Sequence, residues 1–205
     1  MNPLGILGGT FNPIHEGHIQ IAERVLHTCD LERIEFIPCY SPPHRNTPTT
    51  TPEQRLAMVK LAIQHHAQFS INEFELQQKN TSYTVNTLTH LRAQHPAQSL
   101  CLIVGSDAFS HFHKWHQFEK IMTLANLIVV TRNTKNNTYS PLLEKYITTE
   151  RQRLKDNLAG FIYFEKINPI SISATQIRND ITSGKKRIEG LNPSVEAYIK
   201  KNKVY

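Results

Sequence analysis

Residues 4 to 18 read LGILGGTFNPIHEGH, an apolar run that passes through a glycine pair into the expected start of a helix. Leu4–Leu7 has the composition of a buried strand, and a Gly-Gly pair with polar neighbours is an ordinary way to leave one. Two histidines, His15 and His18, then follow three residues apart. A simple turn explains the glycines, but it does not explain the histidines.

Further short runs rich in Ile, Val and Phe follow along the chain, at Ile34–Pro38, Phe69–Leu76, Leu100–Val104, Leu127–Thr131 and Phe161–Phe164. Most are separated by stretches with helical spacing, such as the one that carries Ile19, Ala22, Val25 and Leu26. Apolar strands joined by helical crossovers are typical of a parallel sheet that is buried on both faces. The sequence therefore predicts an α/β fold, a Rossmann-like doubly wound parallel sheet with helices on both faces.

Local signals place several helix ends. Thr51 is a candidate cap, Pro52 suits the first turn, and Gln54 completes a capping-box pattern, so a helix is expected to start there. A further helix is expected at about Thr84–His95, and two more, Ala174–Ser183 and Pro193–Lys201, follow a surface loop expected over residues 133–140. Residues 1–205 are predicted to form one domain with a C-terminal helical extension from about residue 171.

Composition limits the classes of function. The 205 residues are 39% apolar and 20% charged, within the globular range, with a formal net charge of +6 that indicates anionic partners. No apolar stretch is long enough to span a membrane and no secretion signal is present, so a cytoplasmic location and no membrane contact are expected. The three cysteines, Cys29, Cys39 and Cys101, lack metal-site or disulfide spacing and are expected to be free thiols. The basic clusters near the C-terminus lack any nucleic-acid-binding motif, so a nucleic-acid-binding protein remains only a minor alternative.

The glycine turn lies where ligands bind in parallel sheets, at the carboxyl end of a strand and the start of a helix. It is neither a Walker A loop, nor the G-x-G-x-x-G fingerprint, nor the H-E-x-x-H zinc motif. Gly8 and Gly9 would let the backbone approach a phosphate and adopt φ values that other residues avoid, and Thr10 adds a hydroxyl. His15 and His18 project on one side of the first helical turn, which favours a role as phosphate ligands.

The loop GGTFNPIHEGH resembles the (T/H)-x-G-H signature of the nucleotidyltransferase superfamily, in the form found in bacterial nicotinate-nucleotide adenylyltransferases. The resemblance covers nearly the whole chain. It runs through PPHR at 42–45, QRLAM at 54–58, SYTVNTL at 82–88, GSD at 105–107, Trp115 and ISATQIR at 172–178.

This resemblance implies transfer of AMP from ATP to nicotinate mononucleotide, which gives deamido-NAD and pyrophosphate in NAD biosynthesis. The implied catalytic residues are His15, His18 and Arg178. The implied ATP-binding residues are Gly8, Gly9, Thr10, Phe11, His15, His18, Gly105, Asp107, Arg132, Ser173, Thr175 and Arg178. The implied mononucleotide-binding residues are His44, Arg45, Thr84 and Trp115. Mg²⁺ is expected mainly on the ATP phosphates, with no metal site built from the protein.

Several alternatives stay open at this stage. Ser173 or Thr175 also suits a plain helix cap, Gly105–Asp107 a structural turn, and Trp115 a half-buried core position. Asn86 and Asn12 stand where the family usually or often has Asp. His111, His113 and His116 are expected to be exposed on a helix rather than to bind metal. Phosphopantetheine and nicotinamide mononucleotide adenylyltransferases are the nearest rival enzymes, and a homo-oligomer is one alternative for the oligomeric state.

Overall fold

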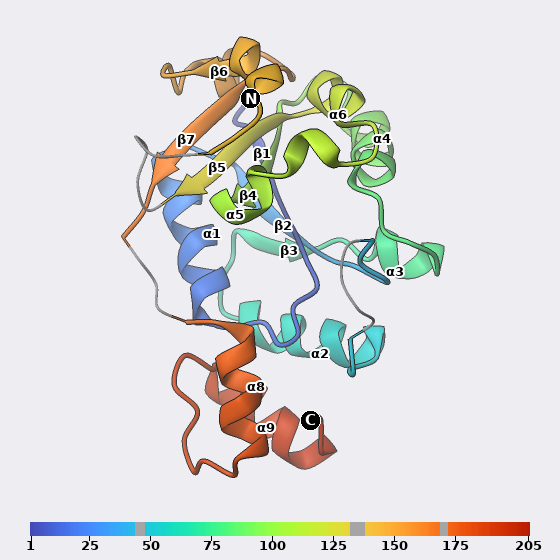
Figure 1. Ribbon diagram of the computed structural model, residues 1–205, viewed down its shortest axis with the longest axis vertical. Coiled ribbons are helices and arrows are strands. Elements are labelled where there is room, and N and C mark those ends of the chain that lie inside the picture. Colours follow the sequence, from blue (N-terminus) through green and yellow to red (C-terminus); the bar gives the residue numbers. More distant parts are fainter. Residues whose placement is uncertain (44–47, 132–137, 169–171) are drawn as a thin grey trace.

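A computed structural model describes residues 1–43, 48–131, 138–168 and 172–205. The described residues form a seven-stranded sheet in the order β3-β2-β1-β4-β5-β7-β6, and every pairing in it is parallel. The strands are β1 (Leu4–Gly9), β2 (Arg33–Pro38), β3 (Phe69–Ile71), β4 (Leu100–Gly105), β5 (Asn126–Thr131), β6 (Ile147–Thr148) and β7 (Ile162–Lys166). The predicted α/β class and doubly wound parallel sheet are confirmed (Figure 1).

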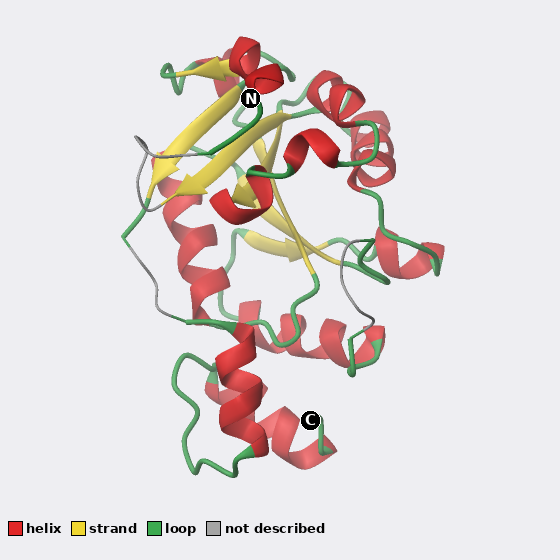
Figure 2. Ribbon diagram, in the orientation of Figure 1, coloured by secondary structure: helices red, strands yellow, loops and turns green. Residues whose placement is uncertain are grey.

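Helices flank the sheet and connect its strands (Figure 2). The longer ones are α1 (Glu16–Thr28), α2 (Pro52–Ile63), α4 (Thr84–Gln94), α6 (Phe118–Leu124), α8 (Ala174–Thr182) and α9 (Pro193–Asn202). Short turns of helix lie at α3 (Phe74–Gln78), α5 (Ser106–Phe109), η1 (Phe112–Lys114), η2 (Pro141–Tyr146) and α7 (Arg153–Asp156). The capping box that starts α2 is confirmed, because Gln54 N donates to Thr51 Oγ1 at 3.2 Å and Thr51 N donates to Gln54 Oε1 at 2.9 Å.

Two apolar layers cover the two faces of the sheet. Alternate residues of a strand point to opposite faces, so Leu127 and Val129 of β5 pack in one cluster while Ile128 packs in the other. The first cluster includes apolar residues of α4 and α6, and the second includes those of α1, α2, α8 and α9. Helices that connect β1, β2 and β3 thus cover one face, and those that lead to β4 and β5 cover the other.

One predicted strand is too long. The run Phe69–Leu76 was expected to be extended throughout, but β3 ends at Ile71 and α3 begins at Phe74. Asn72 causes the change, because its Oδ1 accepts from Phe74 N at 3.0 Å and closes a turn that a strand does not allow. The two-residue strand β6 was not predicted at all, since so short a segment carries no periodic pattern.

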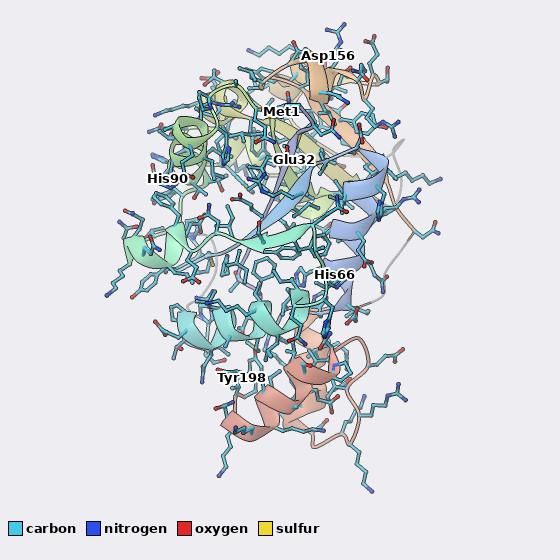
Figure 3. The ribbon with its side chains drawn as sticks, turned by 180° about the vertical axis from the view of Figure 1, so that it is seen from behind. Met1, Glu32, His66, His90, Asp156 and Tyr198 are labelled. Carbon is cyan, nitrogen blue, oxygen red and sulfur yellow. The ribbon has the colours of Figure 1, made fainter. Side chains whose placement is uncertain are left out.

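The sheet has a distinct amino edge and carboxyl edge because all its strands run the same way. In Figure 1 the arrowheads of β5 and β7 point down towards α8, and the N-terminus lies at the opposite end. Met1, Glu32 and Asp156 mark the amino edge in Figure 3, and Tyr198 of α9 lies at the other end of the molecule. None of the helices in the described part of the chain is both long enough and apolar enough to cross a membrane.

Candidate active site

The site lies where the order of the strands reverses, between β1 and β4. From β1 the chain adds β2 and β3 on one side, and β4, β5 and β7 extend the sheet on the other. Paired residues of β1 and β4 end at Ile6 and Leu102, although the strands continue to Gly9 and Gly105. The carboxyl ends of the two strands therefore diverge, and such a crevice is where ligands bind in open α/β sheets.

Glycines end both diverging strands. A Cβ atom built on Gly8 or on Gly105 would meet no atom of the described residues within 4 Å, and both glycines are exposed. The backbone is thus open to a ligand at both strand ends. The expected positive φ angles are wrong for this loop, because neither Gly8 nor Gly9 has one; the left-handed residue is Phe11, with φ of 49°.

Phe11 turns its ring into the core rather than into the crevice. The ring is 2% exposed and meets the edge of the His18 ring, with the two centroids 5.2 Å apart. Its side chain therefore supports His18 from behind. Any contact of this residue with a nucleotide would be made by its backbone.

His15 and His18 lie together at the start of α1. Their ring centroids are 3.8 Å apart, and His15 N donates to His18 Nδ1 at 3.2 Å. His15 is the residue that precedes the first helical turn, and its buried Nδ1 has no hydrogen-bond partner among the described residues. The two histidines, which the spacing predicted on one side of the helix start, thus pack against each other.

Burial keeps both imidazoles neutral. It lowers the pKa of His15 to about 4 and that of His18 to about 3, and the neighbouring ring of His15 adds to the effect on His18. Because His18 Nδ1 accepts a hydrogen bond from a backbone N–H, the single proton of the neutral ring must sit on Nε2. His18 therefore presents an N–H donor at its free nitrogen.

Arg178 reaches the same loop from the far end of the sequence. Its Nη1 donates to the carbonyl oxygen of Asn12 at 2.8 Å, and its Nη2 donates to Thr175 Oγ1 at 3.2 Å. In Figure 1 the first turn of α8 lies beside the first turn of α1. The structure therefore brings Arg178 and Thr175 to the loop that carries the two histidines. Ser173 serves as the cap of α8, since its hydroxyl accepts from Gln176 N at 3.2 Å.

A glycine joins the C-terminal extension to the start of α1. Glu16 N donates to the carbonyl oxygen of Gly190 at 2.9 Å, so one N–H of the first helical turn is already bonded. Gly190 has φ of 76°, and a Cβ atom there would lie 2.8 Å from the side chain of Ile172. Only glycine fits this position without a shift of the chain.

Asn12 bonds to three residues that are distant in the sequence, and these contacts were not predicted. Its Oδ1 accepts from Tyr205 OH at 2.6 Å and from Thr50 Oγ1 at 2.9 Å, while its carbonyl binds Arg178. Burial raises the pKa of Tyr205 above its usual range, so the hydroxyl stays protonated and donates. The only available signal was the polar residue Asn12 inside a glycine loop, and nothing in the sequence linked it to residue 205.

Gly105, the last residue of β4, and Asp107, which follows in α5, lie at the other side of the crevice. Gly105 precedes the short helix α5, and Asp107 is exposed in its first turn. The carboxylate thus stands at the carboxyl end of β4 and is free to meet a ligand. Arg132, predicted to lie near the adenine, falls outside the described residues.

Thr84 and Trp115 come from two segments that meet beyond β4. The rings of Tyr83 and His116 are 4.7 Å apart, which brings the start of α4 beside the segment that follows η1. Thr84 is half-buried in the first turn of α4, and Trp115 is half-buried against Phe112 at 5.3 Å between centroids. His44 and Arg45, predicted to serve the same substrate, fall outside the described residues.

A small hollow of about 110 Å³ lies beside the start of α4, lined in part by Glu75, Ser82 and Asn86. Burial raises the pKa of Glu75, and Thr87 Oγ1 donates to its carboxylate at 2.6 Å. No motif in the sequence pointed to Glu75.

The expectation that His111, His113 and His116 are exposed on a helix is wrong in part, because only His113 lies in η1, and it is half-buried. His111 bonds to Ser110 at 2.8 Å, whereas the ring of His116 packs on Tyr83. Across the described part of the chain, no group of three or more His, Cys, Asp or Glu side chains is placed to hold a metal ion.

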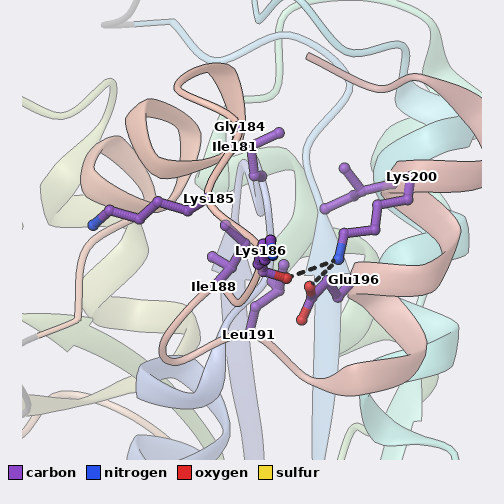
Figure 4. A pocket seen from close by; sticks show the side chains of 9 residues that line it. Ile181, Gly184, Lys185, Lys186, Ile188, Leu191, Glu196 and Lys200 are labelled. Carbon is purple, nitrogen blue, oxygen red and sulfur yellow. Dashed lines mark hydrogen bonds and ion pairs between the residues drawn. The ribbon is translucent and has the colours of Figure 1, made fainter.

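A larger hollow of about 440 Å³ lies in the C-terminal extension, lined by residues of α8, α9 and the segment between them (Figure 4). Its apolar side chains include Ile181, Ile188 and Leu191. Two of the lysines around it are already paired, Lys185 with Asp180 at 2.7 Å and Lys200 with Glu196 at 2.5 Å. Glycine-lined strand ends and paired histidines distinguish the crevice at β1 and β4 from this hollow.

Known proteins resemble this chain over most of its length. The sequence model of the cytidylyltransferase-like family matches residues 6–180. A protein of Coxiella burnetii named probable nicotinate-nucleotide adenylyltransferase is 38% identical, with 98% of this chain and 97% of the relative covered. A protein of Idiomarina loihiensis with the same name is 33% identical, with 98% of each chain covered.

Solved structures share the fold at lower identity. Plasmodium falciparum nicotinic acid mononucleotide adenylyltransferase complexed with APC has a TM-score of 0.74 at 17% identity, over 100% of this chain and 98% of that one. The same enzyme complexed with NaAD gives a TM-score of 0.72 at 20% identity, with the same coverage.

Proposed function

The chain belongs to the nicotinate-nucleotide adenylyltransferase family, and we infer that it transfers AMP from ATP to nicotinate mononucleotide. The products are nicotinate adenine dinucleotide and pyrophosphate, a step of NAD biosynthesis. We further propose that the protein is cytoplasmic, as its composition predicts. One observation supports the site above all: Arg178 donates to the loop that ends in the histidine pair, across 166 positions of sequence.

The chemistry is an in-line displacement at the α-phosphorus of ATP. A bond forms from a phosphate oxygen of the mononucleotide to that phosphorus, and the bond to the bridging oxygen of pyrophosphate breaks. The nucleophile is already ionised at neutral pH, so no general base and no covalent intermediate are required. The protein then has to align two anionic substrates and stabilise the charge that develops.

We assign His18 to the α-phosphate. Its Nδ1 is held by His15 N, so the proton on Nε2 is available as a fixed donor to a phosphate oxygen. A neutral donor in a buried site needs no rearrangement as charge develops, which is how preorganised donors favour a transition state. His15, packed against His18, is assigned to the other phosphates together with Thr10.

Arg178 is the cation assigned to the triphosphate. It lies half-buried in α8, with Thr175 bonded to it and Ser173 at the start of the same helix. A guanidinium offers several donors in one plane, which suits phosphate oxygens. These residues would bind pyrophosphate as it leaves.

The remaining assignments place ATP across the crevice and the mononucleotide beyond β4. The backbone of Gly8, Gly9 and Phe11 is assigned to the ATP phosphates, and Gly105 and Asp107 to the ribose of ATP. Thr84 and the first N–H groups of α4 are assigned to the carboxylate of the nicotinate ring, and Trp115 to stacking on that ring. Arg132, His44 and Arg45 keep the roles that the sequence indicated for them.

We further propose that Mg²⁺ accompanies ATP, held mainly by its phosphates. The residues assigned to the phosphates are imidazoles, hydroxyls, backbone N–H groups and a guanidinium, which offer hydrogen bonds rather than a carboxylate cage. A cation with few protein ligands fits this set, because Mg²⁺ keeps much of its water shell. When bound, it would neutralise part of the phosphate charge.

The test is an assay of pyrophosphate release with ATP and each acceptor in turn. We expect turnover with nicotinate mononucleotide to exceed that with nicotinamide mononucleotide or phosphopantetheine. No dinucleotide product from nicotinate mononucleotide, with turnover on another acceptor, would contradict the assignment. Salt-sensitive binding of DNA or RNA without any transferase activity would instead favour the nucleic-acid-binding alternative.

A further inference from the structure

Arg55 is a charged residue that is completely buried, at 0% exposure, in the first turns of α2. Its Nη1 donates to the carbonyl oxygens of Thr10 at 3.0 Å and Cys39 at 2.5 Å, and its Nη2 donates to the carbonyl of Tyr40 at 2.9 Å. One guanidinium thus binds the loop after β1 and the loop after β2 together.

This placement is unfavourable for stability alone. No carboxylate of the described residues lies within ion-pair distance of Arg55, so its charge is buried without an opposite charge. The positive end of the α2 dipole lies in the same turn, and the buried Nε has no hydrogen-bond partner among the described residues. An apolar side chain would avoid the cost of the buried charge but would take the donor away from the carbonyls of Thr10, Cys39 and Tyr40, so the role of Arg55 lies in holding these carbonyls.

The two loops that Arg55 joins lead to the two halves of the site. The loop after β1 carries Thr10 and continues to His15. The loop after β2 is bonded in turn to the segment before α4, because Tyr40 N donates to Ser82 Oγ at 2.9 Å and Ser82 N donates to the carbonyl of Ser41 at 2.9 Å. Cys39 N also donates to the carbonyl of Gly9 at 3.0 Å, but Arg55 is the side chain that bonds to both loops at once, and through the second loop it is linked to the segment before Thr84.

We propose that Arg55 is a positioning residue that sets the separation of the two substrate loops without touching either substrate. This inference rests on the proposed function. In-line attack depends on the distance and angle between the two substrates, and a misplacement of about 1 Å lowers rate by about 10²-fold. Each substrate alone would still find its own loop, so the loss falls on kcat rather than on either KM.

Arg92 provides a matched control. It also holds loops through carbonyl oxygens, of Leu124 at 2.7 Å and Leu158 at 2.8 Å, but it does so at the amino edge of the sheet. We compare Arg55→Met and Arg55→Lys with Arg92→Met in kcat, in KM for ATP and for nicotinate mononucleotide, and in Tm. Arg55→Lys keeps the charge and carries the test if Arg55→Met does not fold.

We expect both Arg55 variants to lose about 10²-fold in kcat, while each KM changes by less than about 3-fold. Arg55→Lys should not retain the wild-type kcat, because an ammonium group lacks the planar set of N–H donors with which a guanidinium reaches three carbonyls. The dinucleotide product touches both loops, so its affinity should fall about 10-fold, more than that of either substrate. Arg92→Met should lower Tm with kcat unchanged.

Full turnover by Arg55→Lys, or an equal loss of kcat in Arg92→Met, would overturn the proposal. A second measurement tests the role of Arg55 independently of the proposed reaction. Amide hydrogen exchange without substrates should quicken in residues 10–12 and 39–41 of the Arg55 variants, and not in Arg92→Met. If the wild type makes no dinucleotide, the proposed function fails, and unchanged exchange in these segments would still overturn the role of Arg55.

Discussion

At the amino edge of the sheet, buried polar side chains bond to one another and to loop carbonyls, whereas at the carboxyl edge two are left incompletely bonded. Asn126, fully buried at the start of β5, donates to Ser99 Oγ at 3.0 Å and to the carbonyl of Asn157 at 2.9 Å. Its Oδ1 accepts from Phe161 N at 2.9 Å, and Ser99 Oγ donates to the carbonyl of Leu154 at 2.6 Å. The polar atoms of these two side chains are thus bonded within the protein.

The carboxyl edge has the opposite character. His15 Nδ1 and Arg55 Nε are buried without a hydrogen-bond partner in the described part of the chain, and Gly8 and Gly105 leave open space beside the backbone. Two further atoms of this kind among the described residues, Ser70 Oγ in β3 and His113 Nδ1 in η1, lie outside these loops. Buried polar groups are nearly always bonded in folded proteins, and the two exceptions at this edge coincide with the assigned site. We expect mutations at the carboxyl edge to change activity and those at the amino edge to change stability.

The largest expected effect is that of His18→Ala. Loss of one fixed donor to the reacting phosphate should lower kcat by about 10²–10³-fold while the fold survives. His27→Ala is the matched control, because His27 is an exposed histidine in the last turn of the same helix. Steady-state kinetics would check both variants, and normal turnover in a folded His18→Ala would remove His18 from the mechanism.

Arg178→Ala should follow, with turnover lowered by about 10²-fold. The change removes the guanidinium that reaches the Asn12 carbonyl, and no other cation of the described residues donates there. Arg187→Ala, an exposed arginine of the same extension, should leave kcat unchanged. Equal rates for these two variants would show that Arg178 only supports structure.

Asn126→Ala tests the amino edge. It leaves several buried groups unbonded, so we expect the free energy of unfolding to fall by about 2–4 kcal/mol with kcat unchanged. Urea unfolding followed by circular dichroism measures the first quantity. A marked loss of kcat in the folded fraction would contradict the division between the two edges.

Acid should destabilise the carboxyl edge through the buried imidazoles. The pKa values of about 4 for His15 and about 3 for His18 lie below the ordinary 6.5, so the unfolded chain binds more protons as pH falls below 6.5. Stability is therefore present above pH 6.5 and declines towards pH 4. Between about pH 7 and 5, wild type should lose about 1–2 kcal/mol more than His18→Ala does. If the free energies of unfolding of wild type and His18→Ala fell equally with pH, a contribution of the His18 imidazole to acid sensitivity would be excluded.

Tyr205→Phe should have the smallest effect. It removes only the hydroxyl that bonds to Asn12 at 2.6 Å, and about 1 kcal/mol lost from one hydrogen bond corresponds to a KM for ATP raised about 5-fold. Tyr198→Phe in α9 is the control, since its hydroxyl has no assigned bond to the loop. An unchanged KM in Tyr205→Phe would mean that Asn12 is held well enough by Thr50 and Arg178.

Patterns formed by residues close together in the sequence were sufficient to predict much of the fold. The apolar runs became β1, β2, β4, β5 and β7, and the capping box at Thr51 starts α2 as predicted, because these features depend on residues a few positions apart. The same locality explains the overlong strand at Phe69–Leu76, where an Asx turn at Asn72 outweighs an apolar run. The spacing of His15 and His18 likewise placed both rings at one helix start.

The sequence by itself determined the α/β class, the position of the glycine loop at a strand end and the histidine pair, since each rests on neighbours in the chain. Only the tertiary structure decided that Arg178 and Tyr205 meet Asn12, and that Arg55 binds the carbonyls of Thr10, Cys39 and Tyr40. Every residue carries the same backbone carbonyl, so no side-chain pattern tells which carbonyl a distant guanidinium will reach. That choice is made when the elements pack.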